Sequence, residues 1–260
     1  MAIPVTFLIL LVFTLIIVSF TYYFAVERIG TGGQSLKVSM ARENMMNIDN
    51  DISSMLWQSG SSRTLDFKDC GGQLNVQPSA NPLTISITDN NSITATVFNS
   101  SVGRVFYELP YSETADTGLF LRGDSHCIVN QTGSSMTQLF IQKGAQHTEI
   151  VLKYRPTITY VATGTEGNKT VNNIRIFLVN LNSSQTIELM GQIPLKMTCV
   201  SIEDKATSFN VTYQPDTLLI TANFADSSGQ VSIPIASTSY GAIINLELVL
   251  CKIQIDRWMR

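Results

Sequence analysis

The chain has 260 residues, of which 44% are hydrophobic and only 14% are charged, and its formal net charge is −3. Ordinary soluble proteins carry about 25% charged residues, so this one is unusually poor in charge. A chain without a basic excess does not fit a nucleic-acid-binding protein, which normally shows a basic patch or a high pI. Its length allows one or two domains with cores of their own.

The first 25 residues after Met1, AIPVTFLILLVFTLIIVSFTYYFAV, contain no charged side chain. As an α-helix they would extend about 37 Å, which exceeds the roughly 30 Å of a bilayer's hydrocarbon core. No basic residue precedes this run, and it is longer than the roughly 7–15 apolar residues of a secretory signal. The end of the run, TYYFAVE, offers no small-residue cleavage site and gathers aromatic residues instead. We therefore predict a retained hydrophobic helix over residues 1–29.

The orientation of this helix rests on two opposing signals. Arg28, Lys37 and Arg42 follow it, and the positive-inside rule would place them in the cytoplasm, although Glu27 and Glu43 offset this bias. Glycosylation sequons and four cysteines favour an external location for the rest of the chain, and we predict that location. The glycosylation candidates are Asn90, Asn99, Asn130, Asn168, Asn182 and Asn210.

A glycine-rich joint and an amphipathic helix are predicted over residues 30–59. Gly30, Gly32 and Gly33 each cost a helix about 1 kcal/mol relative to alanine, so we expect a break and a hinge there. The helix that follows has Arg42, Glu43, Asn47, Asp49 and Asn50 off its apolar face. Packing of that face on the protein's own sheet is favoured over a coiled coil with a partner, because the pattern covers three heptads at most. The apolar face comprises Val38, Ala41, Met45, Ile48, Ile52 and Met55, and Ser59-Gly60 ends the helix.

Beyond residue 60 the pattern is one of short strands. Runs such as LTISIT, SITATVF, TEIVLKY and NNIRIFLVNL alternate with clusters such as QPSANP, TDNNS and NSSVG. This spacing predicts an antiparallel, sandwich-like β-domain of one or two modules, so the chain as a whole is α+β and mainly β. The polar stretch at 162–173 is either a module boundary or a long hairpin. We divide the body there, into modules over 60–164 and 165–260.

The four cysteines are widely spaced and form no C-x-x-C pair, which argues against a zinc knuckle or a thioredoxin-like site. They permit three disulfide connectivities. Pairs of Cys70 with Cys127 and of Cys199 with Cys251 are favoured, one in each half of the chain. Four buried thiols are the alternative.

No motif in the sequence indicates a defined catalytic or metal-binding mechanism. The segment RGDS (122–125) contains a Gly-Asp-Ser typical of one class of serine esterases, but the α/β alternation that would make Ser125 a nucleophile is missing, and a polar turn is the simplest interpretation. His126 and His147 lack a second metal ligand nearby in sequence. The acidic pair Glu203-Asp204 resembles a solvated turn. We therefore predict no catalytic, metal or cofactor site, and no enzymatic activity.

Cationic and aromatic groups gather near two strand ends, in Tyr154-Arg155-Pro156 and in the C-terminal IDRWMR. A docking surface with cation–π contacts is one interpretation. Ordinary side chains that keep their charged ends in water explain them equally well.

The hydrophobic first helix with its early IPV, the amphipathic continuation and the Ser/Thr/Asn-rich β-domain together resemble archaeal type IV pilin-like proteins. The segments ARENMMNIDNDISSMLWQSGSSRTLDF, GGQLNV, VFYELPYS and SSMTQLFIQKG…EIVLKYRP are similar to a set of archaeal surface proteins with pilin-like N-termini. The similarity covers roughly residues 1–156. Two departures are the absence of a basic leader before Ala2 and of the glutamate that bacterial pilins carry fifth from the mature end, where Val5 lies nearby.

The resemblance implies a structural protein of the cell surface. In pilin-like proteins the hydrophobic helices lie in the membrane before assembly and bundle in the filament core afterwards, so residues 2–29 are expected to contact lipid or identical subunits. A helix that is apolar on all faces needs one of these environments. The alternative is a tethered adhesin or carbohydrate-binding ectodomain that does not polymerise, with a surface glycan as partner.

Overall fold

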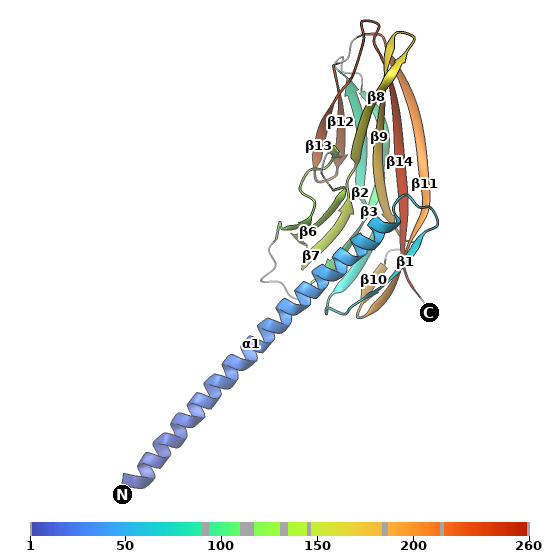
Figure 1. Ribbon diagram of the computed structural model, residues 1–260. Helices are drawn as coiled ribbons and strands as arrows, with labels where there is room; N and C mark the ends of the chain where they lie inside the picture. The colour runs from blue at the N-terminus through green and yellow to red at the C-terminus, as the bar shows by residue number, and fades with distance from the viewer. Residues whose placement is uncertain are drawn as a thin grey trace. The chain divides into compact units, whose positions relative to one another are not determined.

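The computed structural model describes residues 2–89, 94–109, 117–130, 135–144, 147–183, 187–213 and 216–258. Its helix is α1 (Ala2–Met55). The strands (Figure 1) are β1 (Ser62–Phe67), β2 (Gln73–Asp89), β3 (Thr94–Glu108), β4 (Phe120–Arg122), β5 (Val129–Asn130), β6 (Thr137–Lys143), β7 (Thr148–Tyr154), β8 (Thr157–Glu166), β9 (Lys169–Asn182), β10 (Ile187–Met190), β11 (Ile193–Val211), β12 (Thr217–Phe224), β13 (Ser228–Pro234) and β14 (Ala242–Arg257).

The chain divides into two compact units, residues 1–40 and 41–260. Helix α1 runs through the predicted joint without a break, so the prediction of two separate helices is wrong. Glycine adopts right-handed helical angles readily, and its cost of about 1 kcal/mol per residue is small beside the hydrogen bonds of a long helix on both sides. A β-carbon added at Gly32 or Gly33 would meet no atom within 4 Å. A hinge at Gly30, Gly32 and Gly33 stays a prediction.

The apolar stripe of the second unit is buried as predicted. Its side chains are at most 1% exposed, which confirms that the stripe packs against the protein's own β-body. Asp49 was expected off this face, yet its exposed fraction is 0%. The reason is helical geometry, because Asp49 lies four residues after Met45 and three before Ile52, both on the stripe. Val38, the first predicted member of the apolar face, is only half-buried. The buried members are Ala41, Met45, Ile48, Ile52 and Met55.

Two curled, mainly antiparallel sheets form the β-body. One has the strand order β1-β11-β14-β9-β8-β5, and the other has the order β13-β12-β2-β3-β7-β6-β4, with β10 paired to β2. Strands β9, β14 and β11 run side by side in Figure 1, and β14 pairs with β9 in parallel and with β11 antiparallel. The pairing of β11 with β14 is the longest in the first sheet.

Strands from both halves of the sequence are interleaved in both sheets. Strand β1 pairs with β11, and β2 pairs with β12, so each predicted module supplies strands to the other. The stretch 162–173 is the β8–β9 hairpin, which closes at Glu166 and Lys169. Gly167 and Asn168 both have positive φ, 54° and 69°, as a two-residue turn of type I′ requires. The polar stretch is therefore the long hairpin rather than a boundary.

Two predicted separators lie inside strands. QPSANP is part of β2, where the register shifts between Gln77 and Asn81, and NSSVG is part of β3. Pro78 and Pro82 lack a backbone N–H, so the ladder accommodates them at an irregularity rather than ending there. Polar and proline-rich composition alone thus placed turns where the strand continues.

Buried side chains from both sheets meet in one hydrophobic cluster, which includes Ile85 of β2, Ile176 of β9 and Ile220 of β12. Gly103 marks a close approach of β3 to β9. A β-carbon at Gly103 would lie 1.8 Å from the Leu181 carbonyl oxygen. The backbone N–H of Gly103 donates to Asn180 Oδ1 at 2.9 Å. Only glycine permits this backbone contact.

A buried carboxylate joins residues 41–55 of α1 to the β-body. Tyr154 Oη donates to Asp49 Oδ1 at 2.7 Å, and Thr137 Oγ1 donates to the same oxygen at 2.9 Å. Arg122 forms an ion pair with Asp49 Oδ2. The donors come from β7, β6 and β4, so one side chain of the helix connects three neighbouring strands.

Replacing Asp49 by asparagine should destabilise the β-body by about 2–4 kcal/mol, because the Arg122 charge loses its partner and two hydroxyls lose a charged acceptor. Urea unfolding of the full chain in detergent, followed by β-sheet circular dichroism, measures the change. Asp51→Asn is the matched control on the same helix and should cost under about 0.5 kcal/mol. Equal stability of both variants would contradict the role assigned to Asp49.

Candidate functional site

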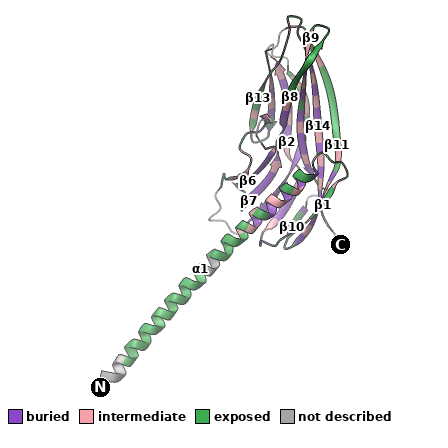
Figure 2. Cartoon of the chain, in the orientation of Figure 1, coloured by how far each residue is buried: buried purple, intermediate pink, exposed green. Residues whose placement is uncertain are grey.

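The N-terminal part of α1 presents an apolar surface on all sides. Every described side chain from residue 7 to residue 28 is exposed (Figure 2), including Leu10 at 62% and Phe20 at 74%. The segment is long and apolar enough to cross a membrane, and none of its most apolar stretch is buried. It is the one candidate membrane span among the described residues.

The two threonine hydroxyls described in this segment are satisfied within the helix. Thr14 Oγ1 donates to the Leu11 carbonyl at 2.8 Å, and Thr21 Oγ1 donates to the Ile17 carbonyl at 2.8 Å. Neither hydroxyl therefore requires water. The Arg28 guanidinium lies 5.6 Å from the centroid of the Phe24 ring, where the apolar run ends. This cation–π contact suits the boundary between apolar and aqueous surroundings.

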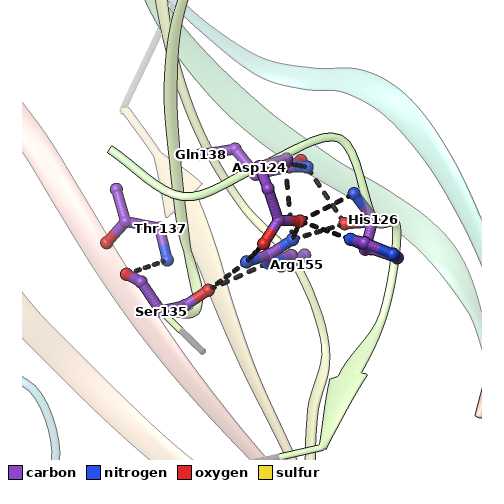
Figure 3. Close-up of polar contacts among 6 residues, drawn as sticks. All are labelled: Asp124, His126, Ser135, Thr137, Gln138 and Arg155. Atoms are coloured by element: carbon purple, nitrogen blue, oxygen red, sulfur yellow. Dashed lines mark hydrogen bonds and ion pairs between the residues drawn. The ribbon is translucent and has the colours of Figure 1, made fainter. Parts of the chain in front are cut away.

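A second polar cluster is centred on Arg155, whose side chain is fully buried. Its Nε and Nη2 donate to the Ser135 carbonyl at 2.9 and 2.7 Å, and its Nη1 donates to the His126 carbonyl at 2.8 Å. The guanidinium also forms a two-nitrogen ion pair with the Asp124 carboxylate (Figure 3). Gln138 Nε2 donates to the Asp124 carbonyl at 2.7 Å. Every N–H of Arg155 is used, so the interpretation of this residue as a snorkelling side chain was wrong.

The RGDS segment is a structural turn in this fold. Arg122 pairs with Asp49, and Asp124 pairs with Arg155. Neither charged side chain of the RGDS segment is therefore available as an independent ligand group. Gly123 has φ of 77°, and a β-carbon there would lie 2.1 Å from the Thr137 carbonyl oxygen. The structure gives no support to Ser125 as an esterase nucleophile, because the neighbouring Asp124 carboxylate forms an ion pair with Arg155.

Hydrogen bonds from Arg155 hold the pKa of the Asp124 carboxyl well below its usual range, against a smaller opposing effect of burial. The backbone N–H of His126 also donates to this carboxylate at 2.9 Å, and the exposed His126 ring lies 2.8 Å from it through Nδ1. The ionised form of Asp124 is therefore the form that stabilises the fold.

The outer side of β8, β9, β14 and β11 carries a groove of about 760 Å³. Asn173 Nδ2 donates to Thr163 Oγ1 at 2.9 Å, Asn245 Nδ2 donates to Asn173 Oδ1 at 3.0 Å, and Ser208 Oγ donates to Asn245 Oδ1 at 2.9 Å. This chain of hydrogen bonds crosses all four strands. Each amide retains further donor or acceptor capacity toward the groove.

A charged row lies next to these amides. Arg175 of β9 forms an ion pair with Glu247, its register partner on β14. Loss of solvation, and then the neighbouring Glu247 carboxylate, raise the pKa of the exposed Asp204 carboxyl on β11, whereas Arg175 lowers it. Two carboxylates and one guanidinium thus share this end of the groove. Asp204, expected in a solvated turn with Glu203, lies in a strand, and Glu203 pairs with Lys252.

Four predicted glycosylation residues are exposed: Asn99, Asn168, Asn182 and Asn210. Asn130 is half-buried, and Asn90 lies outside the described residues. His147 is exposed and lies apart from the Arg155 cluster in the β6–β7 turn. Within the described parts of the chain, no three His, Cys, Asp or Glu side chains gather as a metal site.

All four cysteines are buried thiols in this structure. Cys199 and Cys251, one of the two predicted pairs, have sulfurs 3.5 Å apart. Cys70 and Cys127 have different neighbours: Asn44 Nδ2 donates to Cys70 Sγ at 3.4 Å, and Cys127 packs beside Gly229. A bond between these two stays a prediction.

Replacing Asp124 by asparagine should lower the melting temperature at pH 6 and flatten its decline between pH 5 and pH 3. A carboxyl with a depressed folded-state pKa contributes stability above its unfolded pKa of about 4, and that contribution is lost as the pH falls further. Thermal unfolding at several pH values measures both effects. Asp226→Asn, at an exposed site, is the control and should keep the wild-type pH profile; an equally steep profile in Asp124→Asn would count against the mechanism.

No protein-family model, no curated protein and no solved structure matches this chain.

Proposed function

We propose that this chain is a structural protein of a cell surface, resembling the archaeal pilin-like proteins, and that it acts through its apolar helix. Residues 2–29 sit in the membrane and pack against the same segment of identical subunits when a filament forms. Residues 60–260 form a sandwich-like, glycosylated ectodomain that faces the external solvent. No enzymatic step belongs to this function.

The observation that carries this proposal is the contrast between two parts of one helix. Residues 41–55 have a single apolar face, and the β-body covers it. Residues 7–26 are apolar on every face, and their side chains are exposed throughout. Surface of this extent is stable only in lipid or against other apolar helices, since each exposed Å² of it costs about 25 cal/mol in water.

The charge distribution supports the same assignment. The first charged residues, Glu27 and Arg28, follow the apolar run directly, and exposed aromatic rings precede them. Aromatic side chains at this depth are typical of a membrane interface. The exposed sequons all lie in the β-body, where an external enzyme could modify them.

A charge in the apolar segment should abolish assembly. Leu10→Asp places a carboxylate where lipid or a neighbouring helix lies, at a cost of about 2.5–3.5 kcal/mol at the middle of a membrane. Material sheared from cells and sedimented should contain polymer of the wild-type chain and none of the variant. Leu10→Phe, which keeps the site apolar, should still sediment, and the same comparison applies at Leu11. Wild-type chain that detergent releases only as monomer, with no sheared polymer, would overturn the filament part of the proposal and leave the anchor.

The groove on β8, β9, β14 and β11 supports a second candidate, an adhesin that binds a neutral glycan. Its amides and hydroxyls offer donors and acceptors at the spacing of adjacent strands, as sugar hydroxyls require. The chain from Ala41 onward is the part to test, because deletion into residues 41–55 would remove the buried stripe and Asp49.

If the groove binds a glycan, Asn245→Ala should weaken binding about tenfold or more, since it interrupts the amide chain at its centre. Asn99→Ala, on β3 away from the groove, is the control and should bind as wild type. Glycan-array screening followed by calorimetry measures the effect. Absence of binding, or equal loss in both variants, would exclude this second candidate.

A further inference from the structure

Two buried cysteines lie close together on the paired strands β11 and β14 of the first sheet. Cys199 lies on β11 and Cys251 on β14, their exposed fractions are both 0%, and their sulfurs are 3.5 Å apart. The two residues are not direct register partners, because Cys199 pairs with Ile253 and Cys251 pairs with Ile202, so their side chains meet diagonally across the two strands. A disulfide holds its sulfurs about 2.05 Å apart, and the short distance between these two sulfurs is the observation that suggests one here.

A β-bulge lies beside this contact. The register shifts between Cys199 and Ser201, so that Cys199 pairs with Ile253 while Cys251 pairs with Ile202. Residues two apart on a strand share a face, so Cys251 and Ile253 lie on one side of β14, and Cys199, opposite Ile253, lies on that side too. Val200, the extra residue, is 50% exposed, whereas both cysteines are buried.

We propose that Cys199 and Cys251 form an intramolecular disulfide in the exported protein, which joins β11 to β14 at the bulge. Each thiol loses a proton, the two sulfurs together lose two electrons, and one S–S bond forms. A disulfide-carrying oxidase of the extracytoplasmic compartment accepts the electrons, and its own disulfide becomes a dithiol. The inference rests on the external location in the proposed function and is independent of filament formation.

The surroundings indicate when the bond forms. Burial raises the pKa of the Cys251 thiol to about 12, with a smaller opposing effect of the Trp57 backbone. A thiolate is the species that attacks a disulfide, so the folded body protects this pair from exchange in either direction. Because both cysteines are fully buried in the folded body, an external oxidase reaches them only before the body has folded.

The bond would lie next to the point where the chain leaves α1. The Gly60 N–H donates to the Cys199 carbonyl at 2.8 Å, and the Cys199 N–H donates to the Ser61 carbonyl at 2.9 Å. The chain thus leaves α1, passes Cys199 and enters β1, which pairs with β11. A bond from Cys199 to Cys251 would link this connection covalently to the C-terminal strand β14.

The test is to denature full-length protein from membranes directly in iodoacetamide and to map its peptides by mass spectrometry. We expect alkylation of Cys199 and Cys251 only after reduction, and a linked peptide pair before it. Protease accessibility on intact cells is measured in parallel. Alkylated Cys199 and Cys251 in a body that is outside would overturn the disulfide alone, whereas a body that is inside would overturn the proposed function together with it.

Thermal unfolding provides a second measurement. Reductant present during unfolding should lower the melting temperature of the wild type by about 5–15 °C, the range expected for a disulfide that closes a loop of about 50 residues. The triple variant Cys127→Ala/Cys199→Ala/Cys251→Ala, in which the other predicted pair cannot form either, should show no effect of reductant. Cys127→Ala alone, the control for loss of a buried sulfur, should keep a lowering within this range. An equal response of all three proteins would contradict the assignment.

Discussion

The ion pair of Asp49 with Arg122, together with the hydroxyls of Thr137 and Tyr154, is the constraint on which the β-body depends. A carboxylate at 0% exposure is tolerable only if each oxygen has partners, since an unpaired buried charge costs several kcal/mol. Those partners come from three strands of one sheet. The apolar stripe supplies the packing energy, and the carboxylate selects the one arrangement in which its donors are all in place.

Arg155 applies the same principle at the same end of these strands, where it directly follows Tyr154. Its five N–H groups reach the Asp124 carboxylate and three backbone carbonyls, and so fix the turns at Asp124 and Ser135. The charged residues of RGDS, which look most reactive in the sequence, are therefore occupied by contacts within the fold. The arginine and the aspartate of RGDS are both internal partners, and each would leave a buried charge unpaired if it turned outward to a ligand.

Two surfaces of the molecule support the proposed functions. The apolar part of α1 needs lipid or other helices, and the proposed function follows from that need. The second surface is the groove on β8, β9, β14 and β11, whose amides keep unused hydrogen-bonding capacity. The disulfide proposed for Cys199 and Cys251 belongs to neither surface; it would link β11 to β14 beside the connection from α1 to β1.

By itself the sequence determined the elements whose signal is local: the uncharged apolar run, the 3–4 spacing from Ala41 to Met55, and the alternation in the strands. It also placed Asp49 three residues before Ile52, a signal for burial that the prediction of an exposed polar face overlooked. The tertiary structure decided the rest. Glycines at 30–33 continue a helix, prolines at 78 and 82 lie within a strand, and strands from both halves share each sheet. Arg155 meets Asp124, and Cys199 meets Cys251, only through pairing between distant strands, because contacts of that kind depend on register and topology, which local composition does not encode.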